Sequence, residues 1–340
     1  MHFKYLFCSL LLVSCTLGKP LKMSVKNPQY TPPQKYISPA NLQLGDSVAI
    51  LAPAGLLKGR QQAIESAQNL LKSWGLVPVL GTHLFNKNNH FAGTDAQRFR
   101  DFQQALDAPE IKAIWCARGG YGSMRIADNL NFEGFKKSPK WLIGYSDITV
   151  LHNKLNNLGY ETLHAMMAVN MELDNKSIKN SIASLKAALF GTLPPYKLAS
   201  NKDNQLGDAK GILVGGNLTL LTAQLGSETQ LDTRDKILFI EEIGEYKYHI
   251  DRMMQSLKRA GYFEHCAAVI VGDMMEIKSN SPAWGSSTEA LIMEVLKPYE
   301  FPVAFGIPCG HAPENRALIF GRPIELNVSK SETVISFKDL

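Results

Sequence analysis

The pattern of hydrophobic and polar residues between 47 and 145 alternates between short apolar runs and longer amphipathic stretches. Each apolar run has the length of a strand and ends at turn-forming residues, and each amphipathic stretch has the spacing of a helix. Strands are predicted at 47–52, 77–80, 111–117 and 141–145, and helices at 60–74 and from Thr94 onward, where Thr94 and Gln97 have the form of a capping box. Strands that alternate with helices form right-handed βαβ units, so this part of the chain predicts a parallel sheet.

The pattern changes after a further predicted helix at 176–190. A polar stretch rich in Asn, Lys and Asp, residues 198–208, is expected to link two domains, at 41–197 and 209–340. In the second domain, Gly215-Gly216-Asn217 is predicted as a turn. Strands are predicted there at 211–214, 236–240, 267–271, 303–306, 317–321 and 333–337, and helices at 218–225, 249–260 and 288–297. The second domain is therefore expected to be α/β and rich in strands.

Ser146 follows the fourth predicted strand, where a strand, a tight turn and a helix start meet. In such a turn the hydroxyl is lifted clear of the sheet, and the helix N–H groups can point at whatever it attacks. Only half of the G-x-S-x-G pattern is present, because Ile148 occupies its fifth position. The residues therefore leave two interpretations open, a nucleophile for acyl transfer and a serine that caps the helix.

The loop 118–122 follows the third predicted strand and lies at the same edge of the predicted sheet. It matches neither G-x-G-x-x-G nor a P-loop, so a nucleotide cofactor is not expected. Flexible Gly119 and Gly120 can bring backbone N–H groups to a developing oxyanion, and the alternative is a plain turn.

Three polar residues of the second half are candidates for chemistry. Glu241 and Glu242 follow a strongly apolar strand, where carboxylates are costly unless they are paired or exposed in a cleft. His311 lies on a loop bounded by Gly and Pro. Of the other histidines, His152 is interpreted as a helix residue and His249 and His265 as surface residues.

Composition narrows the classes of protein to which the chain can belong. The 340 residues are enough for about two domains, and 45% hydrophobic with 20% charged residues is typical of a soluble globular protein. The net charge of +5 is scattered, so no nucleic-acid partner is expected. Outside the N-terminus, Cys116, Cys266 and Cys309 are interpreted as buried free thiols. No metal-binding motif is present, so neither a metal nor a cofactor is expected.

The N-terminus has the pattern of an export signal. Lys4 supplies a positive charge, and the apolar run 5–13 is too short to span a bilayer. Leu12-Val13-Ser14-Cys15 resembles the lipobox of bacterial lipoproteins, in which the cysteine is lipidated; the alternative is an ordinary signal peptide cleaved after Gly18. Residues 1–18 are therefore predicted as a signal and 19–40 as a tether. The protein is expected to be exported to the cell envelope, periplasmic or at the outer membrane, with a lipid anchor on Cys15.

Several motifs together carry a family resemblance. The chain resembles the LD-carboxypeptidase family of serine peptidases (muramoyltetrapeptide carboxypeptidases), which also contains the microcin C immunity peptidases. The matching segments occur in the family's order: 45–55, 117–122, 143–149, 215–218, 237–242, 251–252 and 306–311. The resemblance implies a flavodoxin-like N-terminal parallel-sheet domain, a β-rich α/β C-terminal domain and an active site in the cleft between them. It also implies a homodimer.

The resemblance also implies a catalytic triad. Position by position, the nucleophile matches Ser146, the acid Glu241 and the base His311. The family usually has Glu-Asp where this chain has Glu241-Glu242, and His-Gly-Pro where this chain has His164-Ala165-Met166. The oxyanion hole is expected from the N–H of Asp147 and an N–H of the glycine-rich loop, assigned to Gly120.

The expected activity is hydrolysis of the bond before the terminal D-alanine of a peptidoglycan stem tetrapeptide, through an acyl-enzyme. Two alternatives remain open. One is an amidase of peptide-nucleotide antibiotics, which export disfavours because such toxins form in the cytoplasm. The other is a substrate-binding lipoprotein without chemistry, which a missing triad residue would support, although all three positions are filled.

Overall fold

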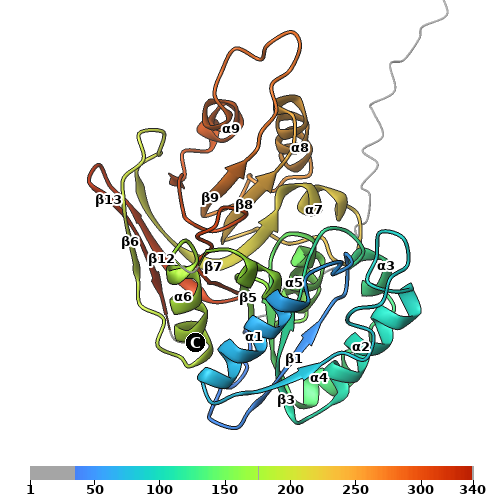
Figure 1. The fold of residues 1–340 in the computed structure, drawn as a ribbon. Helices are drawn as coiled ribbons and strands as arrows, with labels where there is room; N and C mark the ends of the chain where they lie inside the picture. The colour runs from blue at the N-terminus through green and yellow to red at the C-terminus, as the bar shows by residue number, and fades with distance from the viewer. Residues whose placement is uncertain (1–34, 175, 339–340) are drawn as a thin grey trace, which may run out of the picture. The chain divides into compact units, whose positions relative to one another are not determined.

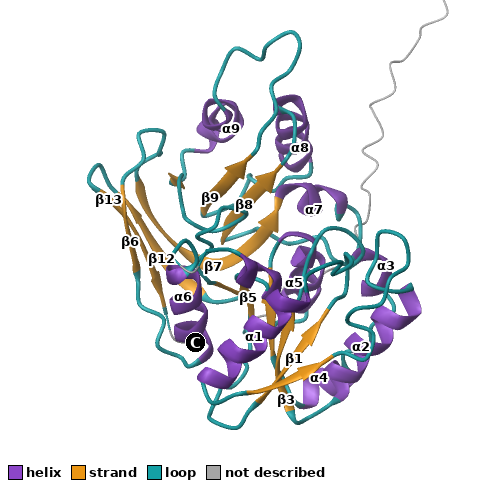
Figure 2. Ribbon diagram, viewed as in Figure 1, coloured by secondary structure: helices purple, strands orange, loops and turns teal. Residues whose placement is uncertain are grey.

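The computed structural model describes residues 35–174 and 176–338. Its strands form two sheets, each accompanied by helices (Figure 2). The predictions that fall on residues 1–34, namely the signal, the lipobox with Cys15 and most of the tether, lie outside the described residues. Within the described part, no helix combines the length and apolar character that crossing a bilayer requires.

The first sheet is the predicted parallel one. Its strand order is β11-β5-β4-β3-β1-β2, and the five strands from β1 to β5 run parallel while β11 pairs antiparallel with β5. The bounds are β1 Ser47–Leu51, β2 Val77–Leu80, β3 Ile111–Cys116, β4 Trp141–Gly144, β5 Thr162–His164 and β11 Leu318–Phe320. Because these parallel strands share one direction, the loops after β1, β3, β4 and β5 all leave at the same edge of the sheet.

Helices of the first part connect these strands (Figure 1). They are α1 Gln61–Ser73, α2 Asp95–Asp107, α3 Met124–Ala127, α4 Glu133–Lys137, α5 Thr149–Asn157 and α6 Lys179–Leu189, with short 3₁₀ turns η1 Ser146–Ile148 and η2 Ala168–Glu172. Thr94 and Gln97 form the predicted capping box of α2, with both reciprocal hydrogen bonds present. Buried residues of α1 and α2 pack with the strands in one hydrophobic core.

The second sheet is larger and mixed. Its strand order is β10-β9-β8-β7-β12-β13-β6, with β7 to β10 parallel and β12, β13 and β6 added antiparallel. The strand bounds are β6 Tyr196–Ala199, β7 Gly207–Asn217, β8 Lys236–Ile243, β9 Ala268–Met275, β10 Val303–Ala304, β12 Pro323–Val328 and β13 Glu332–Phe337. The helices are α7 Leu218–Ala223, α8 Lys247–Arg259 and α9 Thr288–Leu296, and η3 Lys297–Tyr299 is a 3₁₀ turn.

Strand β8 separates two hydrophobic cores. Leu238 and Ile240 pack with α7, α8 and α9, whereas Ile237 and Phe239 pack on the opposite face with β11 of the first sheet. Alternate residues of a strand point to opposite faces, so this division follows from the period of two. Full burial of such side chains contributes about 1.5–3 kcal/mol each relative to exposure. Glu241 continues the Ile237–Phe239 alternation and is thereby directed toward the first sheet.

Several sequence-based boundaries were wrong. Gly215, Gly216 and Asn217, predicted as a turn, are the end of β7. A Cβ on Gly215 would lie 2.0 Å from Phe239 O, and one on Gly216 would lie 2.4 Å from Thr149 Oγ1. These glycines therefore allow β7 to run close to β8 and α5 rather than to turn. The strand expected at 303–306 is shortened to β10, and β5, β6 and β12 were not predicted.

Two segments lie differently from their expected places. β11 was expected within the C-terminal domain, and it pairs with β5 of the first sheet. Of the expected tether, Tyr36 is buried, Ile37 N donates to Gly159 O at 2.7 Å, and Ala40 O accepts a bond from Trp141 Nε1 at 3.0 Å. The described end of that segment is thus part of the folded domain. The segment 198–208 holds the end of β6 and the start of β7.

Candidate active site

Ser146 lies at a strained turn directly after β4. Its φ is +61°, a left-handed conformation that non-glycine residues seldom adopt and that persists only when the surrounding structure enforces it. Tyr145 before it is extended, η1 begins with Ser146 itself, and α5 follows from Thr149. A Cβ on Gly144 would lie 2.8 Å from Ile148 Cγ1, so the tight turn requires glycine there. The turn has the strand-to-helix geometry of a nucleophile elbow.

The glycine-rich loop lies against this turn. A Cβ on Gly119 would approach Asp147 N and Ser146 Cβ at 3.3 Å and Ser146 Oγ at 3.4 Å, so the loop lies beside the serine turn and leaves little room for a side chain at this position. Gly120 has a φ of +96°, which favours glycine. Gly55 N donates to Gly119 O at 3.0 Å and connects this loop to the one that follows β1. The loop that was expected to carry oxyanion donors therefore lies beside the serine.

Two buried charged side chains hold the loop. Asp147 Oδ2 accepts a hydrogen bond from Ser123 N at 2.8 Å, so the elbow and the end of the loop are joined. Arg98 donates to Pro53 O and, at 2.8 Å, to Gly122 O. Burial raises the pKa of Asp147 and lowers that of Arg98. Arg98 was not singled out from the sequence, because its helical position gave no signal that it reaches two loop carbonyls.

His311 and Glu241 form a hydrogen-bonded pair. His311 Nδ1 lies 2.6 Å from Glu241 Oε2, and the glutamate side chain is completely buried. Burial opposes a charge on His311, but the Glu241 carboxylate outweighs it and raises the pKa of the imidazole. A carboxylate on Nδ1 fixes the tautomer that leaves Nε2 available as a base. Glu241 Oε1 has no hydrogen-bond partner among the described residues.

The pair lies beside the serine turn. The Tyr145 and His311 rings are 4.9 Å apart at 65°, and Tyr145 immediately precedes Ser146. Asn170 of η2 donates to the Tyr145 hydroxyl at 3.3 Å. The Ser146 hydroxyl has no hydrogen bond to any described residue; catalytic hydrogen bonds in ligand-free enzymes often tighten only when substrate binds. The structure thus brings the three predicted residues to one place, from two different sheets.

Glu242 has a different role from its neighbour. Its carboxylate accepts hydrogen bonds from Asn217 Nδ2 and Ile243 N at 2.9 Å, and from Thr219 N at 2.7 Å. Asn217 N in turn donates to Thr149 Oγ1 of α5 at 3.0 Å. Burial raises the pKa of Glu242. Glu242 therefore connects β8 to the start of α7, on the side away from His311.

Asp273 is a residue that sequence reasoning missed. Asp273 N donates to Cys309 O at 2.9 Å, and Asp273 Oδ2 accepts from Ala312 N at 3.1 Å, so the aspartate holds the chain on both sides of His311. Burial raises its pKa to about 6. The signal was present in the sequence: Asp273 follows a predicted apolar strand, as Glu241 does.

The remaining histidines and the cysteines lie elsewhere. His152 is a buried residue of α5, as expected, and His265 is exposed. His249 is half-buried rather than a plain surface residue, because Glu245 pairs with it. Cys116, Cys266 and Cys309 are buried and free, as predicted.

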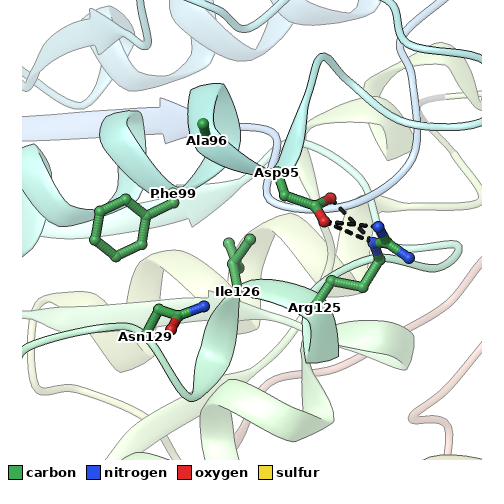
Figure 3. Close-up of a pocket in the computed structure, with 6 residues that line it drawn as sticks. All are labelled: Asp95, Ala96, Phe99, Arg125, Ile126 and Asn129. Carbon is green, nitrogen blue, oxygen red and sulfur yellow. Dashed lines mark hydrogen bonds and ion pairs between the residues drawn. The ribbon is translucent and has the colours of Figure 1, made fainter.

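A separate shallow pocket opens between α2 and α3, away from these residues. Asp95, Ala96, Phe99, Arg125, Ile126 and Asn129 line it. Figure 3 shows that Asp95 and Arg125 face each other across it, with Arg125 Nε at 3.0 and 2.9 Å from the two carboxylate oxygens. Asp95 also pairs with Arg98. Both charged residues at this pocket are therefore already paired, and the pocket contains none of the predicted site residues. Among the described residues, no group of three or more His, Cys, Asp or Glu could hold a metal ion.

Comparisons with known proteins agree with this geometry. Residues 48–165 match the LD-carboxypeptidase N-terminal domain, and residues 210–326 match the LD-carboxypeptidase C-terminal domain. The probable murein peptide carboxypeptidase of Bacillus subtilis is 34% identical over 301 residues, which cover 87% of this chain and 93% of that protein.

Solved structures share the fold. The muramoyltetrapeptide carboxypeptidase from Oxalobacter formigenes has a TM-score of 0.77 and 27% identity, and covers 86% of this chain and 99% of its own. The microcin C7 self immunity protein MccF, in its wild-type apo state, has a TM-score of 0.79 and covers 88% of this chain and 98% of its own. Its identity is 21%, so that likeness concerns the fold alone.

These matches define the class of the molecule, a serine-type peptidase. The chain belongs to the LD-carboxypeptidase family, as its motifs predicted.

Proposed function

We propose that this protein is a serine carboxypeptidase that hydrolyses the L-D peptide bond before the terminal D-alanine of peptidoglycan stem tetrapeptides. The observation that carries the proposal is the 2.6 Å contact of His311 Nδ1 with Glu241 Oε2, beside the strained turn at Ser146. The substrate class is supported by the similar proteins, one named a probable murein peptide carboxypeptidase and the other a muramoyltetrapeptide carboxypeptidase.

In the first half of the reaction, the Ser146 hydroxyl attacks the carbonyl carbon at the L-centre of the diamino acid. A serine hydroxyl is weakly nucleophilic until a neighbouring base accepts its proton, and His311 Nε2 is that base. Glu241 stabilises the imidazolium that forms. Collapse of the tetrahedral intermediate breaks the C–N bond, and His311 returns the proton to the amine of the departing D-alanine.

The negative charge that develops on the carbonyl oxygen needs fixed donors. The N–H groups of Asp147 and Gly120 are proposed to supply them. The position of Gly119 beside Ser146 and Asp147 supports this, because a Cβ added to Gly119 would lie 3.4 Å from Ser146 Oγ and 3.3 Å from Asp147 N. Arg98 and the Asp147 side chain keep the loop in that position, so the donors need no reorganisation during the reaction.

In the second half, water hydrolyses the acyl-enzyme. His311 takes a proton from the water, the hydroxide attacks the acyl carbon, and the ester bond to Ser146 Oγ breaks. The proton on His311 then returns to Ser146, and the tripeptide is released with a new carboxylate.

The test is a mass assay with the purified full-length protein. A stem tetrapeptide that ends in a diamino acid and D-alanine is expected to lose one alanine residue. The matched control is the pentapeptide ending in two D-alanines, whose terminal bond joins two D-residues and is expected to resist. No alanine loss from the tetrapeptide, or equal loss from the pentapeptide, would contradict the proposal.

The same assay separates the other candidates. Cleavage of a peptidyl-sulfamoyl nucleoside without cleavage of the tetrapeptide would indicate an antibiotic amidase instead. Binding of the tetrapeptide without release of alanine would indicate a binding lipoprotein, which the intact His311–Glu241 pair disfavours.

We further propose that the protein is exported and anchored through Cys15, and that it acts as a homodimer. The export signal pattern and the lipobox-like Leu12–Cys15 support the first proposal. Family resemblance supports the second. Light scattering of the purified protein tests it, and a monomer would contradict it.

A further inference from the structure

Two arginines lie at the edge of the first sheet that carries Ser146. Arg118 belongs to the loop after β3 and directly precedes Gly119, which lies beside Ser146. Arg60 ends the loop after β1, immediately before α1 (Figure 1). Because β1, β3 and β4 are parallel, both loops leave the sheet at the edge where the serine turn begins.

These arginines differ in their partners. Arg60 Nη1 lies 2.8 Å from Glu172 Oε1 of η2. Arg118 forms no ion pair with any described residue, and its one hydrogen bond runs from Nη1 to Leu56 O at 2.6 Å. Burial lowers the pKa of Arg118, the positive charge of Arg60 lowers it further, and Glu172 counteracts both. Arg60 thus has a carboxylate partner, and Arg118 has none among the described residues.

A partly buried guanidinium without a carboxylate is costly to the folded protein. Its planar fork has several donors, and the bond to Leu56 O uses one of them. The other nearby arginines are already engaged: Arg98 and Arg125 both pair with Asp95. Arg118 is therefore the cation at this edge of the sheet that is free to bind a carboxylate from outside the protein.

We propose that Arg118 binds the free terminal carboxylate of the peptide whose last bond Ser146 attacks. This inference rests on the proposed function. In such a peptide the carboxylate is carried by the residue immediately after the scissile carbonyl, so its cation must come from a segment next to the nucleophile. Arg118 meets that condition because its neighbour Gly119 lies beside Ser146, where an added Cβ would be 3.4 Å from Ser146 Oγ.

The proposal specifies the substrate class. Peptides with a free C-terminal carboxylate are accepted, and those whose terminal alanine is amidated or joined to another peptide are rejected. The selection arises because a neutral amide offers the guanidinium no charge-assisted, bidentate contact. The enzyme is accordingly restricted to ends of chains rather than to internal bonds.

The experiment compares two stem tetrapeptides, one ending in D-alanine and the other in D-alanine amide. For the wild-type protein, kcat/KM is expected to be about 100-fold higher for the carboxylate peptide, the size of a charged hydrogen-bonded contact. In Arg118→Gln the carboxylate peptide should lose about 100-fold while the amide peptide is unchanged, so the preference disappears. Arg118→Lys should keep part of it. Arg125→Gln, an exposed arginine on α3, is the matched control and should behave as the wild type.

The outcomes separate this proposal from the proposed function. Equal cleavage of both peptides by the wild-type protein, or equal loss on both in Arg118→Gln, would overturn the role of Arg118 and leave the peptidase activity standing. Cleavage of neither peptide by the wild-type protein would overturn both proposals together.

Discussion

Glu241 and His311 stand 70 residues apart in the chain, and their Oε2 and Nδ1 atoms are 2.6 Å apart in the structure. The carboxylate comes from the end of β8, and the imidazole from the loop between β10 and β11. The contact shows which of two adjacent glutamates is placed to act on His311. Glu242 points to the opposite side of β8 and is engaged with Asn217, Thr219 and Ile243.

The two glutamates should therefore respond differently to the same substitution. Glu241→Gln is expected to lower kcat by roughly 10³–10⁴-fold, because an amide neither fixes the tautomer of His311 nor stabilises the imidazolium. Glu242→Gln should keep most of the activity and lose about 1–3 kcal/mol of unfolding free energy, because an amide cannot accept from all three of its donors. Steady-state kinetics and urea unfolding of both variants measure this. Loss of activity in the Glu242 variant alone would reverse the assignment.

The pH dependence of the activity should report His311. Burial acts against its charge, but Glu241 prevails and raises the pKa of His311 above 6.5. Only neutral imidazole can accept the serine proton, so kcat/KM should fall on the acid side with an apparent pKa above 6.5. In Glu241→Gln that limb should move to lower pH.

A profile of kcat/KM between about pH 5 and pH 9 measures the limb. A limb below 6.5, or one that does not move in the variant, would contradict the assignment. Because the pKa of His311 is raised in the folded protein, protonated His311 stabilises the fold. This contribution is complete below pH 6.5 and is lost as the pH rises through the pKa of His311 in the folded protein.

His152 predicts a pH effect of the opposite sign on stability. Burial lowers its pKa from 6.5 to about 4, although its hydrogen bond to Gly144 O at 2.9 Å acts the other way. The unfolded chain takes up the proton more readily than the folded protein does. Neutral His152 therefore contributes stability that is complete above pH 6.5 and is lost as the pH falls toward 4.

Comparison with His152→Gln isolates this effect, since glutamine can keep a donor for Gly144 O. Between about pH 8 and pH 5, the unfolding free energy of the wild type should fall by about 2 kcal/mol more than that of the variant. Other buried titrating groups, including His164, are present in both proteins and cancel. The unfolding free energy of each protein is measured by urea titration at each pH. If it changes equally with pH in the two proteins, His152 is excluded as the source.

Local patterns predicted most elements because their information lies within one segment. The capping box at Thr94 and the apolar periods of α1, β3 and β8 required no distant partner. The strand β5 was missed because it is only three residues long and includes polar Thr162 and His164. The pairing of β11 with β5 depends on segments about 150 residues apart, which no local period encodes.

The residues of the candidate site also differ in whether the local sequence could reveal them. Ser146 could be selected as a candidate from its strand-to-helix turn, although a serine in such a turn is more often a helix cap. The roles of Glu241 and His311 came from family resemblance, since nothing near either residue points to the other. Arg98 and Asp273 were missed because their function depends on backbone carbonyls and amides of other loops.

The location of the protein depends on Cys15. If this residue is lipidated, the full-length protein should appear in membrane fractions, because lipoproteins carry several acyl chains and a single chain anchors only weakly. Cys15→Ala should release the protein or block its processing. Cell fractionation followed by N-terminal mass mapping measures both. A wholly soluble native protein that starts at Lys19 would indicate an ordinary signal peptide instead.

Removal of the Ser146 hydroxyl tests whether this residue is the nucleophile. The measurement is the rate of D-alanine release from a stem tetrapeptide by Ser146→Ala, with circular dichroism and urea unfolding as the check on the fold. If Ser146 is the nucleophile, turnover should fall on the order of a millionfold, while the unfolding free energy should change by less than about 2 kcal/mol. Near-wild-type release of D-alanine by a folded Ser146→Ala protein would contradict this assignment.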